Sequence, residues 1–136
     1  MIDMTLEIAE RAARAARAKA AEIGVSMTVS VVDEAGRLVL TLKGDGTGFL
    51  STETSRAKAV AAVAFRRSTR ELVELQKTNP VFWAALPAVA RGEALPSTGA
   101  APITVDAAVI GAIGCGGGTP DQDHECAAAG AAAAIA

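Results

Sequence analysis

The chain has little aromatic content and no long apolar run. Its 136 residues include three phenylalanines, one tryptophan and no tyrosine, so the core must be built from alanine, valine, leucine and isoleucine. No apolar stretch approaches the roughly 20 residues of a membrane-spanning helix, and the first residues lack the apolar centre of a secretory signal. We therefore expect a cytoplasmic protein with no membrane contact.

The chain also lacks an excess of charge of either sign. Its 13 Lys and Arg residues nearly balance its 15 Asp and Glu residues, giving a net charge of −2, whereas a nucleic-acid-binding domain shows a basic footprint. There are one histidine and two cysteines, whose spacing matches no standard structural zinc motif. These features argue against a nucleic-acid partner and against a metal, and they favour free thiols over a disulfide.

The length and composition indicate one compact, alanine-rich domain. A chain of 136 residues is long enough to bury a single core, and we expect one domain over residues 1–136. Hydrophobic residues make up 51% of the chain, with alanine prominent among them. Because close packing of alanine-rich helices often accompanies subunit contacts, we expect a homo-oligomer.

Capping signals divide the chain into its elements. Thr5 is a predicted N-cap and Gly24 a predicted helix stop. Ser68 begins a capping box, and Asn79 and Thr119 each precede a proline at a first helical position. The expected helices cover 5–23, a segment from 51 or 52, 69–77, 80–83 and 120 to the C-terminus; the expected strands cover 26–32, 38–42, 103–105 and 108–114.

Two predicted hairpins give the fold class. Strands joined by short turns pair antiparallel, so we expect an α/β (α+β) domain with an antiparallel sheet. The segment 87–101 is expected to be a loop with one short strand near Leu95. The faces expected to be buried are Leu6, Ala9, Ala13, Ala16, Ala20 and Ile23 in the first helix, and Ala57, Val60, Ala61 and Ala64 in the second.

The segment around the three consecutive glycines is the strongest candidate for a site. Gly116, Gly117 and Gly118 follow a predicted strand, and Thr119 opens the last helix. Backbone N–H groups of such a loop, together with a helix N-terminus, form an anion-binding pocket. We therefore expect these four residues to bind an anionic small molecule.

Three side chains beside this loop are candidates for catalysis. The helix N-terminus would favour the thiolate of Cys115, making it a nucleophile, although a small buried residue at a strand end has the same sequence pattern. His124 is a candidate general base or haem ligand, kept neutral by the helix N-terminus, with a solvated surface histidine as the alternative. Asp123, its neighbour, is a candidate acid–base group.

Two further residues complete the candidate binding set. Arg66 could hold a carboxylate or a haem propionate in two hydrogen bonds, or could simply lie at a solvated helix end. Asp45 lies in a loop with three glycines over residues 43–48, and it could close a pocket.

Taken in order, the segments resemble the GlcG/HbpS-like family, also described as the haem-degrading or PduO C-terminal-like domain. The resemblance rests on TLE at 5–7, VSVVDEAG at 29–36, KAVAAVAFRRST at 58–69, API at 101–103, VIGAIG at 109–114 and QD at 122–123. It implies a profilin-like fold with a five-stranded antiparallel sheet and helices on both faces, and assembly into dimers or larger rings. It also implies haem or a related tetrapyrrole as a candidate ligand.

Two functions from different classes follow. The first is an oligomeric small-molecule-binding domain that takes haem or another anionic ligand at the Gly116–Thr119 loop. The second is a small cofactor-independent enzyme for an organic acid, an epoxide or a similar metabolite, which would use Cys115 or the Asp123 and His124 pair, with glycine amides stabilising developing negative charge.

Overall fold

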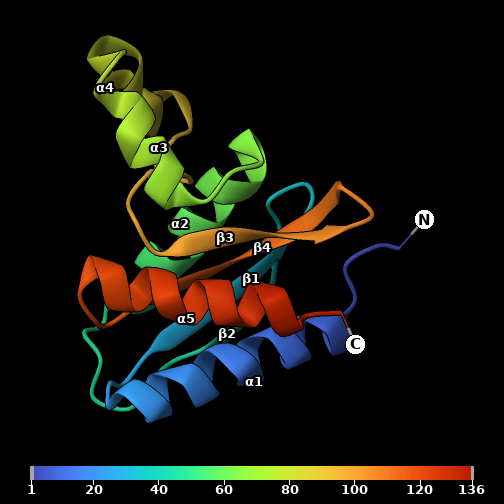
Figure 1. Cartoon of the computed structure of the whole chain (residues 1–136). Coiled ribbons are helices and arrows are strands. Elements are labelled where there is room, and N and C mark those ends of the chain that lie inside the picture. Colours follow the sequence, from blue (N-terminus) through green and yellow to red (C-terminus); the bar gives the residue numbers. More distant parts are fainter. Residues whose placement is uncertain (1, 136) are drawn as a thin grey trace.

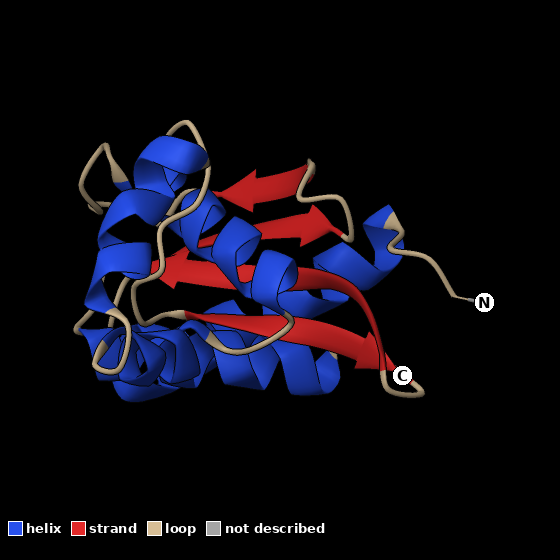
Figure 2. Ribbon diagram, turned by 90° about the horizontal axis from the view of Figure 1, so that it is seen from above, coloured by secondary structure: helices blue, strands red, loops and turns tan. Residues whose placement is uncertain are grey.

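The computed structural model describes residues 2–135, and its helices and strands form an α+β fold (Figure 1). Helices cover both faces of one sheet (Figure 2), as expected. The elements in chain order are α1 (Leu6–Ile23), β1 (Thr28–Asp33), β2 (Leu38–Leu42), α2 (Ser51–Phe65), α3 (Thr69–Gln76), α4 (Pro80–Val89), β3 (Ala100–Val105), β4 (Ala108–Gly116) and α5 (Pro120–Ala133).

The sheet has four strands in the order β2-β1-β4-β3, and every pair is antiparallel. The expectation of five strands is therefore wrong for the described residues. The strand expected near Leu95 does not form, because the Leu95 N–H donates to the Ala57 carbonyl of α2 at 3.0 Å and not to another strand. The segment before it is shorter than expected, because α4 continues to Val89.

One face of the sheet packs against α1 and α5, which lie side by side (Figure 1). Its core is apolar and includes Val29 and Val31 of β1 and Ile113 of β4, all fully buried. Alanines dominate the helix side of this core, as expected for α1, but Leu6 is 56% exposed and Ile8 takes its place in the core. The small side chains let the two helices approach each other closely.

The other face of the sheet meets α2 through a small apolar cluster around Val32 and, beside it, through hydroxyl groups. Alternation along β1 turns Thr28 and Ser30 toward α2, where both are fully buried. We call the following set the hydroxyl ladder: Thr28, Ser30, Thr41, Thr47, Ser51 and Ser55. Its oxygens lie 2.7–3.1 Å apart along two chains, Thr41–Ser30–Ser55 and Thr47–Thr28–Ser51. Each buried hydroxyl therefore has a partner, as burial of a polar group requires.

Glycine in β4 permits this close contact. A Cβ atom added at Gly114 would overlap the backbone oxygen of Ser55, and one at Gly116 would lie 3.3 Å from the Thr54 hydroxyl. At these two glycines the helix and the sheet therefore meet through backbone and hydroxyl groups. The same geometry exposes Ala64, which was expected to be buried, because α2 turns Ser55 and Ala59 toward the sheet instead.

Helices α3 and α4 form an arm that projects from the sheet (Figure 1). Ser68 caps α3 by accepting the Glu71 N–H, as its capping box predicts. The arm joins the body through Thr69, whose hydroxyl accepts the Ala100 N–H at 2.9 Å, and through a small core of Ala61, Leu72, Trp83, Leu86 and Ala94. We call this unit the α3–α4 arm.

Candidate functional site

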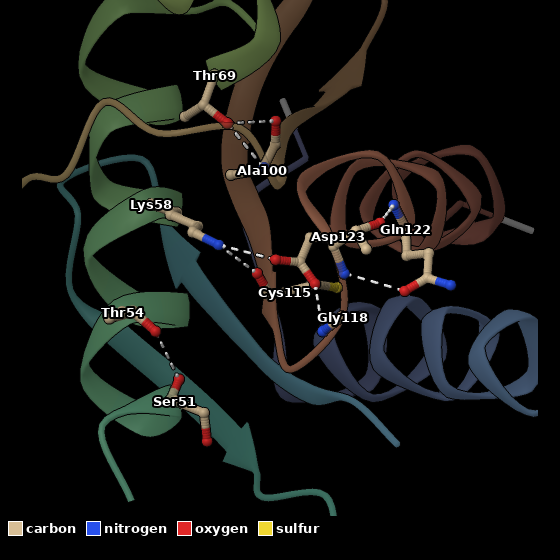
Figure 3. Close-up of polar contacts among 10 residues, drawn as sticks. Ser51, Thr54, Lys58, Thr69, Ala100, Cys115, Gly118, Gln122 and Asp123 are labelled. Atoms are coloured by element: carbon tan, nitrogen blue, oxygen red, sulfur yellow. Dashed lines mark hydrogen bonds and ion pairs between the residues drawn. The ribbon is translucent and has the colours of Figure 1, made fainter. Parts of the chain in front are cut away.

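A buried ion pair lies where α2, the end of β4 and the start of α5 meet (Figure 3). The Lys58 ammonium donates to the Asp123 carboxylate and to the backbone oxygen of Cys115, at 3.1 Å each. Only 7% of Lys58 and 4% of Asp123 is exposed. Charged residues are almost never buried without a partner, and here each charge has one.

The local sequence places Asp123 at this point. Thr119 and Gln122 form the predicted capping box, with Pro120 at the first helical position, so α5 begins at a fixed residue. Asp123 then lies in the first turn of α5, and its second carboxylate oxygen accepts the Gly118 N–H at 2.9 Å. Both oxygens of Asp123 are therefore held, one by Lys58 and one by the glycine loop.

Gly99 makes room for the pair. Its φ is +136°, and an added Cβ atom would lie 2.9 Å from the Asp123 Cβ and 3.0 Å from the Lys58 ammonium. A side chain at this position would push the two charged groups apart. The chain before β3 is thus the fourth segment, beside α2, β4 and α5, that closes around the ion pair.

Burial sets the electrostatics of Asp123. Loss of solvation raises the pKa of its carboxyl above the ordinary value, while the Lys58 charge and the Gly118 N–H oppose that rise. The net change in the pKa of Asp123 is upward because the carboxylate is almost fully enclosed. Asp123 therefore keeps a proton more readily than an exposed aspartate does.

Two backbone N–H groups of the glycine loop that were predicted to bind an anion donate instead to side chains of the protein itself. The Gly118 N–H donates to Asp123, and the Thr119 N–H donates to the Gln122 side chain at 3.0 Å. Gly116 is buried at the end of β4, whereas Gly117 is exposed. Gly117 has a φ of +132°, the left-handed region that favours glycine.

The loop that carries Asp45 lies beside Gly117. A Cβ atom added at Gly117 would lie 2.8 Å from the Ser26 oxygen and 3.1 Å from a Thr47 carbon. The Ser26 hydroxyl also donates to the backbone oxygen of Asp45. The structure therefore brings two of the predicted binding segments, 43–48 and 116–119, to the same end of the sheet.

Cys115 contributes its carbonyl oxygen to the ion pair, not its thiol. The side chain alternates onto the α1–α5 face and is fully buried. Burial raises the pKa of the Cys115 thiol well above its usual range, and the nearby Cys126 and Asp123 add to this effect. The expected effect of the helix N-terminus on the thiolate is outweighed by burial, because the thiol lies in the apolar α1–α5 core.

His124 lies one residue beyond Asp123 and is half-buried. Its Nδ1 atom is buried and has no hydrogen-bond partner within residues 2–135. Burial and the nearby Arg70 charge lower the pKa of His124 from its ordinary value near 6.5, while Asp121 opposes this. The imidazole is therefore held in the neutral form, and Nε2 is the nitrogen left to reach a ligand.

Arg70 of α3 is the cation whose charge acts on His124. It pairs with Asp121 of α5 at 2.8 Å, linking the α3–α4 arm to the start of α5. Arg66, the predicted ligand for carboxylates, is instead the exposed, left-handed C-cap of α2. It follows Lys58 by eight residues, about 12 Å along the helix axis, so the structure does not bring Arg66 to the ion pair.

Sequence reasoning missed Lys58 and the hydroxyl ladder. The available signal was the spacing of Ser51, Ser55 and Lys58, which recur every three or four residues on one face of an otherwise alanine-rich helix. In the described part of the chain no group of three or more His, Cys, Asp or Glu residues could hold a metal ion. Nor does any helix there have the length and apolar character to cross a membrane.

Comparisons with known proteins place the chain among a defined set of relatives. A family model described as "Haem degrading protein HbpS-like" matches residues 4–132. An uncharacterized 15.0 kDa protein of Citrobacter freundii is 32% identical over 89% of this chain and 84% of its own length. The chain spans only 34% of the corrinoid adenosyltransferase PduO of Salmonella typhimurium, at 29% identity.

Solved structures agree with this placement. A crystal structure of a double mutant of Streptomyces reticuli HbpS has a TM-score of 0.86 at 35% identity, covering 97% of this chain and 87% of that one. A crystal structure of a PduOC:heme complex has a TM-score of 0.87 at 27% identity, covering 98% of this chain and 96% of that one.

Proposed function

The chain belongs to the HbpS-like family, and on that basis we propose that it binds haem or a related anionic tetrapyrrole beside the start of α5. The family description and the haem complex of the similar PduOC domain support the ligand class. The observation in this chain that carries the proposal is His124, a neutral, half-buried imidazole with one nitrogen left for a ligand.

His124 and Arg70 are the two kinds of side chain that a haem group requires. Haem iron is held in many proteins by a neutral histidine nitrogen, and His124 is the only histidine in the chain. Haem also carries carboxylates, and the charge of the Arg70 guanidinium acts on the imidazole. The Gly116–Thr119 loop lies at the same end of α5 and forms the edge of the proposed site, with Gly117 as its exposed member.

In this proposal each residue has a defined task. His124 would hold the iron of a bound haem through Nε2, and burial favours the neutral ring that such binding requires. Arg70, which pairs with Asp121, would also pair with a carboxylate of the ligand. The Lys58–Asp123 pair holds the glycine loop and the first turn of α5 in place without touching the ligand. A bound haem would supply an iron centre and its characteristic absorbance.

Titration with haemin tests the proposal. The wild-type protein is expected to shift the Soret band with saturation near one haemin per chain. His124→Gln should lose the spectral signature of histidine ligation, and Arg70→Gln should weaken binding several-fold with the signature retained. Glu125→Gln, an exposed neighbour on the same helix turn, is the matched control and should bind as the wild type does.

The outcomes separate the parts of the proposal. A wild-type titration without saturation would overturn haem binding. Saturation with a His124→Gln spectrum identical to that of the wild type would retain the function but remove His124 as the ligand. An equal loss in Glu125→Gln would show that the effect comes from disturbing α5 as a whole.

A further inference from the structure

A cleft lies between α2 and the end of the α3–α4 arm, and we call it the arm cleft. Its volume is about 330 Å³, within the range of small-molecule sites, which often form where two parts of a fold meet. His124 and Arg70 of the proposed haem site do not line it. The lining residues that matter for binding are Glu53, Arg56, Ala57, Pro87, Ala94 and Leu95.

Backbone hydrogen bonds hold the apolar walls of the arm cleft. The Leu95 N–H donates to the Ala57 carbonyl at 3.0 Å, which fixes the chain before β3 against α2. The Gly92 N–H donates to the Pro87 carbonyl at 2.9 Å and closes the end of α4. Ala57 and Ala94 are themselves buried. The cleft is therefore formed before any ligand enters, and its walls suit a short aliphatic chain.

The Arg56 guanidinium has more donors than partners. Its side chain is only 26% exposed, and one terminal nitrogen donates to the Glu93 carboxylate. This is its one side-chain hydrogen bond within residues 2–135, although a guanidinium carries five N–H groups in a planar fork. The free part of the fork matches a carboxylate, which can accept two parallel hydrogen bonds. Arg56 can thus hold Glu93 and a ligand carboxylate together.

The Glu53 carboxylate lines the same cleft without a cation beside it. One of its oxygens accepts the Thr52 hydroxyl at 2.9 Å, and among the described residues it forms no ion pair. Arg56 follows it by three residues in α2 but pairs with Glu93 instead. Cβ atoms at this spacing on a helix are about 5–6 Å apart. A carboxylate and a guanidinium are therefore both within reach of one small ligand.

We propose that the arm cleft binds a free aliphatic amino acid. The ligand carboxylate accepts hydrogen bonds from Arg56, and the ligand ammonium donates to Glu53. The aliphatic side chain lies against Ala57, Ala94 and Leu95.

The charges of the cleft favour a zwitterion over a ligand with one charge. A simple carboxylate would leave Glu53 unpaired and would add a negative charge beside Glu53 and Glu93. A simple amine would leave the free donors of Arg56 without a partner. Either ligand therefore loses an interaction that the amino acid makes, and such a loss gives specificity.

Titration of nitrogen-15-labelled protein with L-leucine, followed by amide NMR shifts, tests the proposal. Saturable shifts are expected at the amides of Ala57, Gly92 and Leu95. The dissociation constant should be on the order of 1 mM, because a small ligand gains free energy from few atoms. 4-Methylpentanoate and 3-methylbutylamine keep the aliphatic chain but carry one charge each. Both should bind at least about tenfold more weakly, since each loses a charge-assisted hydrogen bond.

Four variants assign the groups. Glu53→Gln and Arg56→Gln should each weaken leucine binding about tenfold. Glu93→Gln should instead strengthen it several-fold, because Arg56 then has no competing carboxylate. Arg91→Gln is the matched control, at an exposed residue of the same connection that does not line the cleft, and it should bind leucine as the wild type does.

Four results would overturn the proposal. The first is a wild type without saturable shifts up to roughly 50 mM leucine. The second is equal affinity for leucine and 4-methylpentanoate. The third is a loss in Glu93→Gln equal to that in Arg56→Gln, which would mean that the pair only supports the arm. The fourth is the same loss in Arg91→Gln. All titrations are made without haemin, so a failure of haem binding would leave each result unchanged.

Discussion

The Lys58 ammonium and the Asp123 carboxylate lie 3.1 Å apart inside the protein, although 65 residues separate them in the chain. The pair joins the middle of α2 to the first turn of α5 across the end of β4. A buried ion pair adds little stability over an apolar pair of similar volume, but removal of one partner leaves an isolated buried charge. That asymmetry gives the first prediction.

Asp123→Ala is expected to lower the free energy of unfolding by about 3–5 kcal/mol, because it leaves the Lys58 charge buried without its counter-ion. The double change Lys58→Met with Asp123→Leu should cost less than Asp123→Ala alone. Urea unfolding measures both. As a control, Lys77→Met removes an exposed pair with Glu74 and should change stability by less than about 1 kcal/mol. A double variant that is less stable than Asp123→Ala would contradict this account.

Gly114→Ala is expected to destabilise the fold by about 3 kcal/mol or more, because its Cβ atom would overlap the backbone of α2 at Ser55. Thermal or urea unfolding measures the loss. Gly48→Ala is the matched control: no atom lies within 4 Å of the added Cβ atom, and the change should stay within about 0.5 kcal/mol. Equal effects at the two glycines would show that helix–sheet contact is not the cause.

Both thiols are expected to be unreactive in the folded protein. Cys115 and Cys126 are fully buried, and burial raises the pKa of Cys126 to about 11, so little thiolate is present at neutral pH. Labelling with iodoacetamide should be slow in buffer and fast in urea. The matched variants Cys115→Ser and Cys126→Ser assign each site. Rapid labelling of Cys115 at pH 6 in the native state would restore it as a candidate nucleophile.

The stability of the protein is expected to fall as the pH is lowered through 6.5. The folded state lowers the pKa of His124 from its ordinary value near 6.5, so the unfolded chain binds a proton there before the folded chain does. The contribution of His124 to stability is therefore complete above pH 6.5. It decreases as the pH falls below this value, until the pH is also below the folded-state pKa.

Comparing the pH dependence of stability in the wild type and in His124→Gln separates the effect of His124 from that of Asp123. The raised pKa of Asp123 acts in the opposite direction, because the folded state then holds the proton more tightly. Melting temperatures at pH 7 and pH 5 should differ less in His124→Gln than in the wild type. A larger pH dependence in the variant would mean that His124 is stabilised in its charged form.

Local signals in the sequence predicted most of the fold. Thr5, Ser68 and Thr119 cap their helices as expected, because capping depends only on residues within one turn. The end of α4 was predicted too early because Pro87 reads as a breaker. In the last turn it removes only one backbone hydrogen bond, so the helix continues to Val89.

The candidate site was predicted only in part, for reasons of geometry. The loop 116–119 and Asp123 are close in sequence and were found together. Lys58 was not, because its contact with Asp123 depends on how α2 lies across the sheet. The position of the Cys115 thiol followed from alternation: Ile113 is apolar and fully buried in the same core, and a residue two positions along a strand shares its face.

The hydroxyl ladder under α2 has a thermal consequence. Apolar surface exposed on unfolding raises the heat capacity, whereas polar surface lowers it. The α2 side of the sheet combines this ladder with the small apolar cluster around Val32, whereas the α1–α5 side holds the larger apolar core, so the α1–α5 side supplies most of the heat-capacity change. On cooling, apolar contacts weaken, and the α1–α5 side therefore loses stability while the hydrogen-bonded α2 side retains it.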